Sequence, residues 1–172
     1  MLVTLWHAVN IEAQMLRDYV PSDAEALSSV ALAAFEQFRP YYSDWAAMAD
    51  GVSKMPSLSK TGEIIVAEDQ GQIVGGVAYV GPHKPKANYF DIGWPIIRML
   101  VVAPAARGKK IGRLLTDECI YRARRDKSSM IALHTTPIMT VALPMYLRMG
   151  FKKLRDAPDI FGVQYAVYTK LL

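Results

Sequence analysis

The hexapeptide RGKKIG at positions 107–112 combines two glycines with three cations, and these residue types suit the binding of an anion. The apolar run IRMLVVAP before it predicts a buried strand, and apolar residues at helical spacing after it predict a helix. Amide groups at a helix start have no intrahelical partner, and the helix dipole adds partial positive charge there. Gly108 and Gly112 would let a ligand approach the backbone closely. The segment therefore predicts a binding site for a diphosphate.

The glycine spacing of this segment excludes two common phosphate sites. A GxGxxG dinucleotide fingerprint needs a third glycine, a GxxxxGK[ST] phosphate loop needs a Lys-Ser or Lys-Thr pair, and neither is present. The alternative is a solvated turn before an ordinary helix. Cations at a helix N-terminus oppose the dipole, so a purely structural sequence would place Asp or Glu where Arg107, Lys109 and Lys110 stand. This comparison favours the binding interpretation.

The whole chain has the size and composition of one folded domain. It has 172 residues, 52% of them hydrophobic, and a net charge of +4, which is far below the dense basic stripes of nucleic-acid-binding proteins. The single cysteine, Cys119, excludes an internal disulfide and a thiolate zinc site, and we expect no metal. No window approaches the ~20 apolar residues that cross a bilayer, and no basic region of a signal peptide precedes Glu12. These features favour a cytoplasmic protein that binds neither nucleic acid nor membranes.

Hydrophobic periodicity predicts the elements that would position the hexapeptide. Strands are expected at 15–20, 63–68, 73–80, 96–102, 129–134, from 151, and at 163–171; helices are expected at about 23–39, within 41–52, at 111–124 and at about 139–149. Ser22 or Asp23 can cap the first helix. Residues 69–72 have hairpin chemistry, and the proline-rich stretch 82–95 should be a loop. The order of elements predicts an α/β domain with a mixed sheet.

Two segments resemble the signatures of one protein family. The stretch VVAPAARGKKIGRLL is similar to the pantetheine-diphosphate segment of the GCN5-related N-acetyltransferases (GNAT), with Lys110 where the family pattern prefers glycine. MYLRMGFKK at 145–153 resembles the second signature, a helix that carries a tyrosine and ends in Gly-Phe. The resemblance implies a single N-acetyltransferase domain at 15–172 after an N-terminal arm at 1–14. It also implies a mostly antiparallel central sheet, flanked by helices and splayed between the fourth and fifth strands.

The resemblance implies acetyl-CoA as the cosubstrate and a primary amine as the acceptor, with direct transfer of the acetyl group. In this fold the strand before the phosphate loop separates from the next strand, so its backbone is free to bond the pantetheine arm. An amide at Val101 or a neighbour is expected to stabilise the oxyanion. The residues expected to bind the cofactor are Leu100, Val101, Val102, Arg107, Gly108, Lys109, Lys110, Ile111, Gly112 and Arg113.

Tyr146 is the expected catalytic acid. By resemblance its hydroxyl lies near the thioester sulfur, and a phenol with a pKa of about 10 can protonate a thiolate. The alternative is that Tyr146 is an aromatic core residue. The general base stays open, because relatives often have glutamate where this chain has Ile96. Asp91, His134 or a water path could serve, although His134 could equally be a core histidine.

Other features leave alternatives open. Seven side chains are expected either to wall the acceptor site or to pack a lid or dimer surface: Tyr41, Tyr42, Trp45, Met48, Tyr89, Phe90 and Trp94. A non-catalytic acyl-CoA binding or sensing module is the alternative to an enzyme, and the missing glutamate favours it. The last strands or the arm could form a homodimer, because an edge strand rich in Val and Tyr is adhesive. Cys119 lies on an apolar helix face and is interpreted as a core residue rather than a nucleophile.

Overall fold

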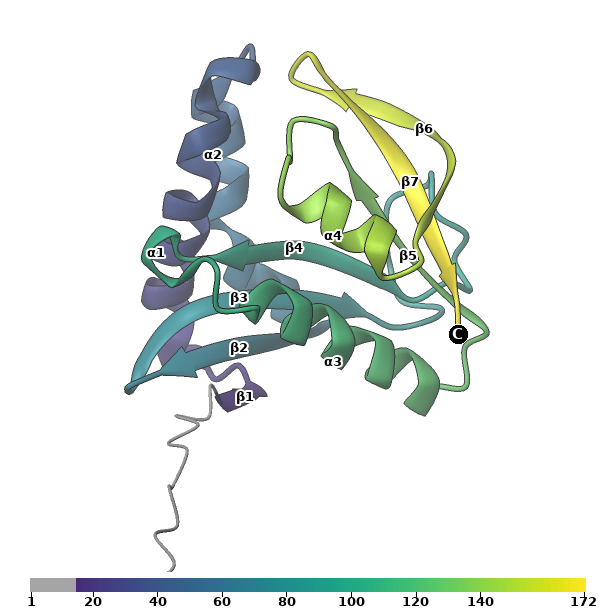
Figure 1. The fold of residues 1–172 in the computed structure, drawn as a ribbon, viewed down its shortest axis with the longest axis horizontal. Coiled ribbons are helices and arrows are strands. Elements are labelled where there is room, and N and C mark those ends of the chain that lie inside the picture. The colour runs from purple at the N-terminus through teal and green to yellow at the C-terminus, as the bar shows by residue number, and fades with distance from the viewer. Residues whose placement is uncertain (1–14) are drawn as a thin grey trace, which may run out of the picture.

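Seven strands form one sheet in the order β1-β2-β3-β4-β5-β7-β6 (Figure 1). The computed structural model describes residues 15–172, so the predicted arm at 1–14 lies outside the described residues. The strands are β1 (Met15–Asp18), β2 (Glu63–Asp69), β3 (Gln72–Val80), β4 (Ile96–Val102), β5 (Met130–Thr135), β6 (Lys152–Ile160) and β7 (Val163–Leu171). All neighbours are antiparallel except β4 and β5. The predicted mixed, mostly antiparallel sheet is confirmed.

Helices cover both faces of the sheet. They are α1 (Ala24–Phe35), α2 (Trp45–Ser53), α3 (Ile111–Arg125) and α4 (Ala142–Arg148). Val77 and Ala78 are successive residues of β3, so their side chains point to opposite faces. Val77 packs in the cluster that includes α3 and α4, and Ala78 packs in the cluster that includes α1 and α2. Within residues 15–172 no helix has the length and apolar character needed to cross a membrane.

The sheet opens between β4 and β5, as predicted. The two strands are paired only at Ile96 and Ala132, beside a bond in which the Ala132 amide donates to the Pro95 carbonyl at 3.0 Å. Beyond this point they diverge, and α4 lies in front of the opening (Figure 1). The edge of β4 that faces β5 therefore lacks a strand partner among the described residues from 97 to 102. Its backbone groups are available to a ligand.

A β-bulge in β4 lies at the start of this opening. Met99 and Leu100 together oppose the single residue Val77 of β3. Met99 has a φ of 57°, in the left-handed region that residues other than glycine rarely adopt. After the bulge, Leu100 packs with the α3 cluster and Val101 with the α1 cluster. The bulge thus redirects the backbone of β4 where the strands separate.

The predicted cap of the first helix is wrong. No side chain caps α1, because the Asp23 carboxylate is already bound elsewhere. It accepts from the Arg17 guanidinium at 2.8 and 3.0 Å and from the Val20 amide at 2.9 Å. A charged partner forms stronger hydrogen bonds than a helix amide does, so the arginine prevails.

The premise of the predicted dimer surface is also wrong. The strand rich in Val and Tyr, β7, lies between β5 and β6, so it is not an edge. The edge strand at this end of the sheet is β6, and its exposed residues include Lys152, Lys153, Arg155 and Asp156. Charged side chains on an edge strand oppose pairing with another chain. The homodimer itself stays a prediction.

Candidate active site

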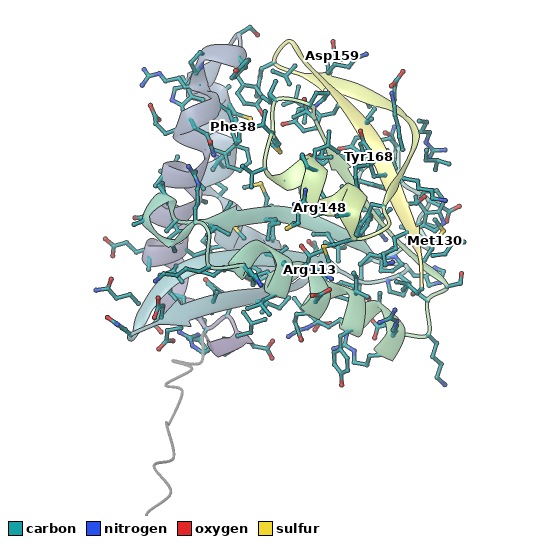
Figure 2. All side chains as sticks on the ribbon, viewed as in Figure 1. Phe38, Arg113, Met130, Arg148, Asp159 and Tyr168 are labelled. Atoms are coloured by element: carbon teal, nitrogen blue, oxygen red, sulfur yellow. The ribbon has the colours of Figure 1, made fainter. Side chains whose placement is uncertain are left out.

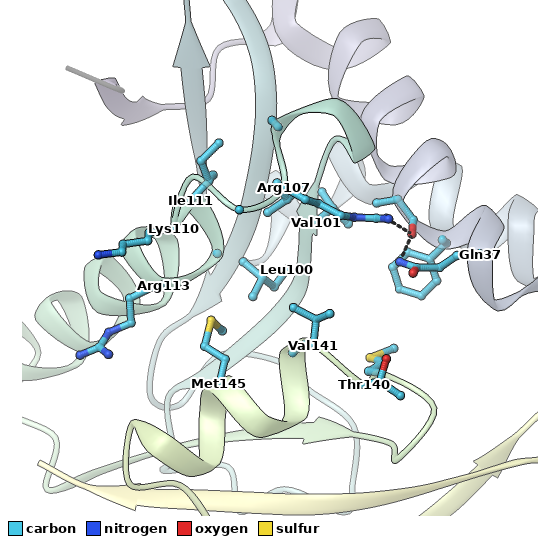
Figure 3. A pocket seen from close by; sticks show the side chains of 18 of the residues that line it. Gln37, Leu100, Val101, Arg107, Lys110, Ile111, Arg113, Thr140, Val141 and Met145 are labelled. Carbon is cyan, nitrogen blue, oxygen red and sulfur yellow. Dashed lines mark hydrogen bonds between the residues drawn. The ribbon is translucent and has the colours of Figure 1, made fainter. Parts of the chain in front are cut away.

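A cleft of about 690 Å³ lies beside the opening in the sheet (Figure 3). Leu100, Val101 and Val102 of β4 line it, together with the start of α3. The lining also includes residues that the sequence analysis did not single out: Ala34, Phe35, Gln37 and Phe38 at and just after the end of α1, and Met139, Thr140, Val141, Ala142, Met145 and Arg148 in or before α4. A cleft of this size holds a small molecule with an extended chain.

The N-terminus of α3 offers backbone donors to this cleft. The first amide with a helical acceptor is that of Leu114, which donates to the Lys110 carbonyl at 3.0 Å. The amides of residues 110–113 have no acceptor within the described part of the chain, and no side chain caps the helix. Gly108 and Lys110 have φ of 82° and 62°, which turn the backbone sharply before the helix. Four free amides and the helix dipole form a site for a phosphate group.

The cations of the hexapeptide have different surroundings. Arg107 extends toward α1 and donates to the Ala34 carbonyl at 3.3 Å, whereas Lys110 and Arg113 extend the other way (Figure 3). Lys109 does not line the cleft, because it forms an ion pair with Asp69 at 3.0 Å. Every other residue expected to bind the cofactor lines the cleft. The structure therefore brings the predicted set together with the exception of Lys109.

A further cation, Arg148 of α4, lies across the cleft from α3. Figure 2 shows Arg113 and Arg148 on the same side of the sheet, on neighbouring helices. Arg148 is exposed and forms no ion pair with any described residue. No pattern in the sequence marks it, because its place depends on how α4 packs.

Neither the packing of the protein nor its backbone conformation requires glycine at position 112. A Cβ atom at this position would lie 3.7 Å from the Met145 sulfur and 3.8 Å from side-chain atoms of Leu100 and Val102. These are ordinary van der Waals contacts, and Gly112 has no positive φ. Alanine would therefore fit the fold, and it would fill space at the base of the cleft. The glycine keeps the cleft open.

Tyr146, the predicted acid, is buried in α4. Only 5% of its surface is exposed, and its ring packs edge-on against Phe151 with centroids 5.6 Å apart. It is not among the residues that line the cleft. Burial, and then the nearby Cys119, raise the pKa of its hydroxyl, so Tyr146 is protonated at neutral pH. Its role as an acid stays a prediction.

The candidate bases differ in environment. His134 is stacked on Tyr89, and its Nδ1 lies 2.8 Å from the Tyr89 hydroxyl. Burial, and then the charge of Arg98, lower the pKa of His134 to about 4, so it is neutral at pH 7. Asp91 is exposed and accepts from the Gly93 amide at 2.8 Å. Ile96 is 2% exposed and carries no titratable group.

Six of the seven predicted acceptor-wall residues gather in one cluster on the α1 and α2 side of the sheet. Tyr42 and Phe90 are buried there, and Trp45, Met48, Tyr89 and Trp94 pack against them. The Tyr42 and Tyr165 hydroxyls are hydrogen-bonded at 2.5 Å. The seventh residue, Tyr41, is 58% exposed and lies outside the cluster.

Residues 15–172 contain no group of three or more His, Cys, Asp or Glu side chains placed to hold a metal.

The open sheet and the donor-lined cleft beside it define an α/β fold with a site suited to an extended ligand that carries an anionic group. The sequence model of the Acetyltransferase (GNAT) domain matches residues 60–153, which is more than half of the chain. The chain therefore belongs to the GNAT acetyltransferase family, and acyl transfer is the activity of that family.

Similar proteins carry related descriptions. N-acetyltransferase 8B of Mus musculus is 34% identical over 88 residues, which are 51% of this chain and 37% of the mouse protein. The match thus spans little more than a third of that relative. A GCN5-related N-acetyltransferase from Rhodopseudomonas palustris has a TM-score of 0.73 at 24% identity, over 92% of this chain and 96% of the other. Ribosomal-protein-alanine N-acetyltransferase from Brucella melitensis has a TM-score of 0.65 at 22% identity, over 92% and 99%. These two likenesses show the fold alone.

Proposed function

We propose that the protein transfers an acetyl group directly from acetyl-CoA to a primary amine. The observation that carries this proposal is the cleft in which four free amides at the start of α3 adjoin the unpaired edge of β4. The amides suit a diphosphate, and the strand edge suits the amide groups of a pantetheine arm. Acetyl-CoA contains both groups in that order. The name of the mouse relative also supports an N-acetyltransferase.

The reaction needs one bond exchange and one proton transfer. The neutral amine attacks the thioester carbonyl, an amide near the bulge at Met99 stabilises the oxyanion, and the carbon–sulfur bond breaks. Tyr146 would give its proton to the departing thiolate and recover one from the amine through solvent. With Ile96 apolar and His134 a weak proton acceptor because of its low pKa, water is the proposed route for the amine proton.

The second candidate is a non-catalytic acyl-CoA sensor on the same fold. The observation that favours it is the lack of a ready base, because the low pKa of His134 makes the ring a weak proton acceptor. Turnover of acetyl-CoA with any amine would exclude this candidate.

Three further parts belong to the acetyltransferase proposal: a single catalytic domain at 15–172, a cytoplasmic location that suits one unpaired cysteine, and no nucleic-acid partner.

Calorimetric titration with acetyl-CoA tests the cleft through two matched variants, Gly108→Asp and Gly108→Asn. A Cβ atom at Gly108 meets nothing within 4 Å, and Asp and Asn tolerate its positive φ better than other residues. The two side chains have the same size and differ in charge. We expect the aspartate to weaken binding about 100-fold or more by repelling the diphosphate, and the asparagine to weaken it about tenfold or less.

Two results would contradict the proposal. Equal affinity of both variants and the wild type would place the diphosphate elsewhere. Absence of binding by the wild type would remove acetyl-CoA as the cosubstrate. Release of the coenzyme A thiol in the presence of an amine panel then separates the enzyme from the sensor.

A further inference from the structure

Arg98 is a cation on the central strand of the sheet, and no residue from 15 to 172 forms an ion pair or hydrogen bond with its side chain. Strand β4 is the fourth of seven, and the neighbouring residues Ile96 and Ile97 are only 2% and 3% exposed. Arg98 itself is exposed, and it forms no hydrogen bond or ion pair with any described residue. Arg17 of β1, in contrast, binds both Asp23 and Glu68. Arg17 thus has carboxylate partners that Arg98 lacks.

The side chain of Arg98 lies on the face opposite the start of α3. Arg98 pairs with Ala78 of β3, and directly paired residues share a face. Ala78 packs against the α1 side of the sheet, whereas Ile111 at the start of α3 packs on the other side. The thioester would enter the opening from the α3 side. A second substrate must therefore reach it from the face on which Arg98 lies.

A small cavity of about 40 Å³ lies at this place, where β4 and β5 separate. Arg98, Tyr89 and His134 line it together with Ile96 at the strand junction. The Tyr89 hydroxyl and His134 Nδ1 are hydrogen-bonded at 2.8 Å, so both provide polar atoms without charge. The single charge of Arg98 is unbalanced there. The positive potential favours an anionic group and repels a second cation.

We infer that the acceptor is an amine that carries a carboxylate, and that Arg98 binds this carboxylate. The substrate class is then amino acids and their close analogues, not polyamines. A planar guanidinium binds a carboxylate through two parallel hydrogen bonds, which would also orient the amine toward the thioester. This inference rests on the proposed acetyl transfer and names its second substrate. The aromatic cluster of Trp45, Tyr89 and Trp94 suits an apolar side chain on that substrate.

The test compares each carboxylate with its carboxamide. Phenylalanine and phenylalaninamide, leucine and leucinamide, and spermidine are offered with saturating acetyl-CoA, and release of the coenzyme A thiol is followed. The amine of a carboxamide is less basic, which by itself favours the carboxamide, so a preference for the acid reports the carboxylate. We expect the wild type to prefer the acids by about tenfold or more in kcat/KM, mainly through KM.

Three variants show where this preference arises. Arg98→Gln should abolish the preference for the acid, and Arg98→Lys should retain part of it through charge alone. Arg124→Gln is the matched control, because Arg124 is also exposed and without an ion pair but lies at the far end of α3. It should leave the preference unchanged. Equal acetyl-CoA affinity of all four proteins by titration shows that the variants are folded.

Several results would overturn the inference. One is a wild type that uses spermidine or the carboxamides as well as the acids. Another is an acid preference that survives in Arg98→Gln. A third is an effect on the acyl donor: Arg98→Gln would lose activity with succinyl-CoA but keep its preference for the acids. Arg98 would then bind the acyl group of the donor, not the acceptor. A wild type that binds no acetyl-CoA would instead refute the proposed function, whereas acetylation without regard to the carboxylate refutes this inference alone.

Discussion

Cations lie at both ends of α3, and two of them, Arg122 and Lys110, have opposite surroundings. At the C-terminal end the Arg122 guanidinium is bound to Asp18, Glu63 and Glu118 at 2.6, 2.6 and 2.9 Å. Arg125 adds bonds to Glu63, and together the two arginines hold the pKa of that carboxyl below its usual range. At the N-terminal end Lys110 forms no ion pair within the described chain, and the amides beside it have no acceptor.

The comparison distinguishes cations that stabilise the fold from cations that are free to bind a ligand. A cation at a helix C-terminus is favoured by the dipole, and the carboxylates of Asp18 and Glu63 on Arg122 connect α3 to β1 and β2. A cation at the N-terminus opposes the dipole, so it needs an external anion to be favourable. Arg98 follows the second pattern on a strand. Acidic partners and position together indicate the role, because Arg124 also lacks an ion pair but lies at the far end of α3.

The largest expected effect is on stability at the C-terminal end. Arg122→Ala should lower the free energy of unfolding by about 2 kcal/mol, less than for a fully buried pair because its carboxylate partners are partly exposed. Arg124→Ala removes an unpaired cation from the same turn and should change it by less than about 0.5 kcal/mol. Urea titration measures both. Equal effects would mean that the ion pairs of Arg122 contribute nothing.

The next prediction concerns Gly112, where one substitution should raise the stability of the protein and weaken its binding of acetyl-CoA. Gly112→Ala should weaken acetyl-CoA binding about tenfold by filling the cleft, and it should stabilise α3 by up to about 1 kcal/mol. Gly51→Ala in α2 is the control, because a Cβ atom there meets nothing within 4 Å. It should stabilise the protein without changing affinity. Unchanged affinity in Gly112→Ala would show that the ligand does not approach α3 closely.

The smallest effect compares two lysines with the same backbone strain. Lys110 and Lys127 flank α3 with φ of 62° and 58°, so glycine at either position should raise the free energy of unfolding by about 0.5 kcal/mol. Lys110→Gly should also weaken acetyl-CoA binding by about threefold through loss of a charge, whereas Lys127→Gly should not. Thermal unfolding and titration check both. A loss of affinity in Lys127→Gly would contradict the contrast between the two ends.

Local signals were enough to predict most elements. The hairpin at Asp69–Gln72 forms as predicted, because Gln70 and Gly71 adopt the positive φ values that a two-residue turn requires. The helical period after Gly108 predicts α3, although Leu114, which stands at an apolar position of this period, is 40% exposed. The fourth helix begins at Ala142, not at Met139. Glycine spacing and charge were enough to predict where the cleft begins, because both act among residues that are neighbours in the sequence.

Features that depend on distant contacts could not be predicted. Lys109 is drawn from the cleft by Asp69, a residue 40 positions away. The bulge at Met99 has no signal in the sequence, because methionine does not favour a positive φ. The end of α1 reaches the cleft only through the packing of α1 on β3 and β4. The unpaired state of Arg98 is visible only once every nearby carboxylate has been placed.

The buried thiol of Cys119 can report when α3 separates from the sheet. Cys119 is the only cysteine of the sequence, it is 0% exposed in α3, and burial raises the pKa of its thiol. A thiol reagent can therefore label it only when α3 leaves the sheet. In the native protein the same reagent detects released coenzyme A without background. One chromogenic label thus measures turnover in the folded protein and the rate of unfolding when no substrate is present.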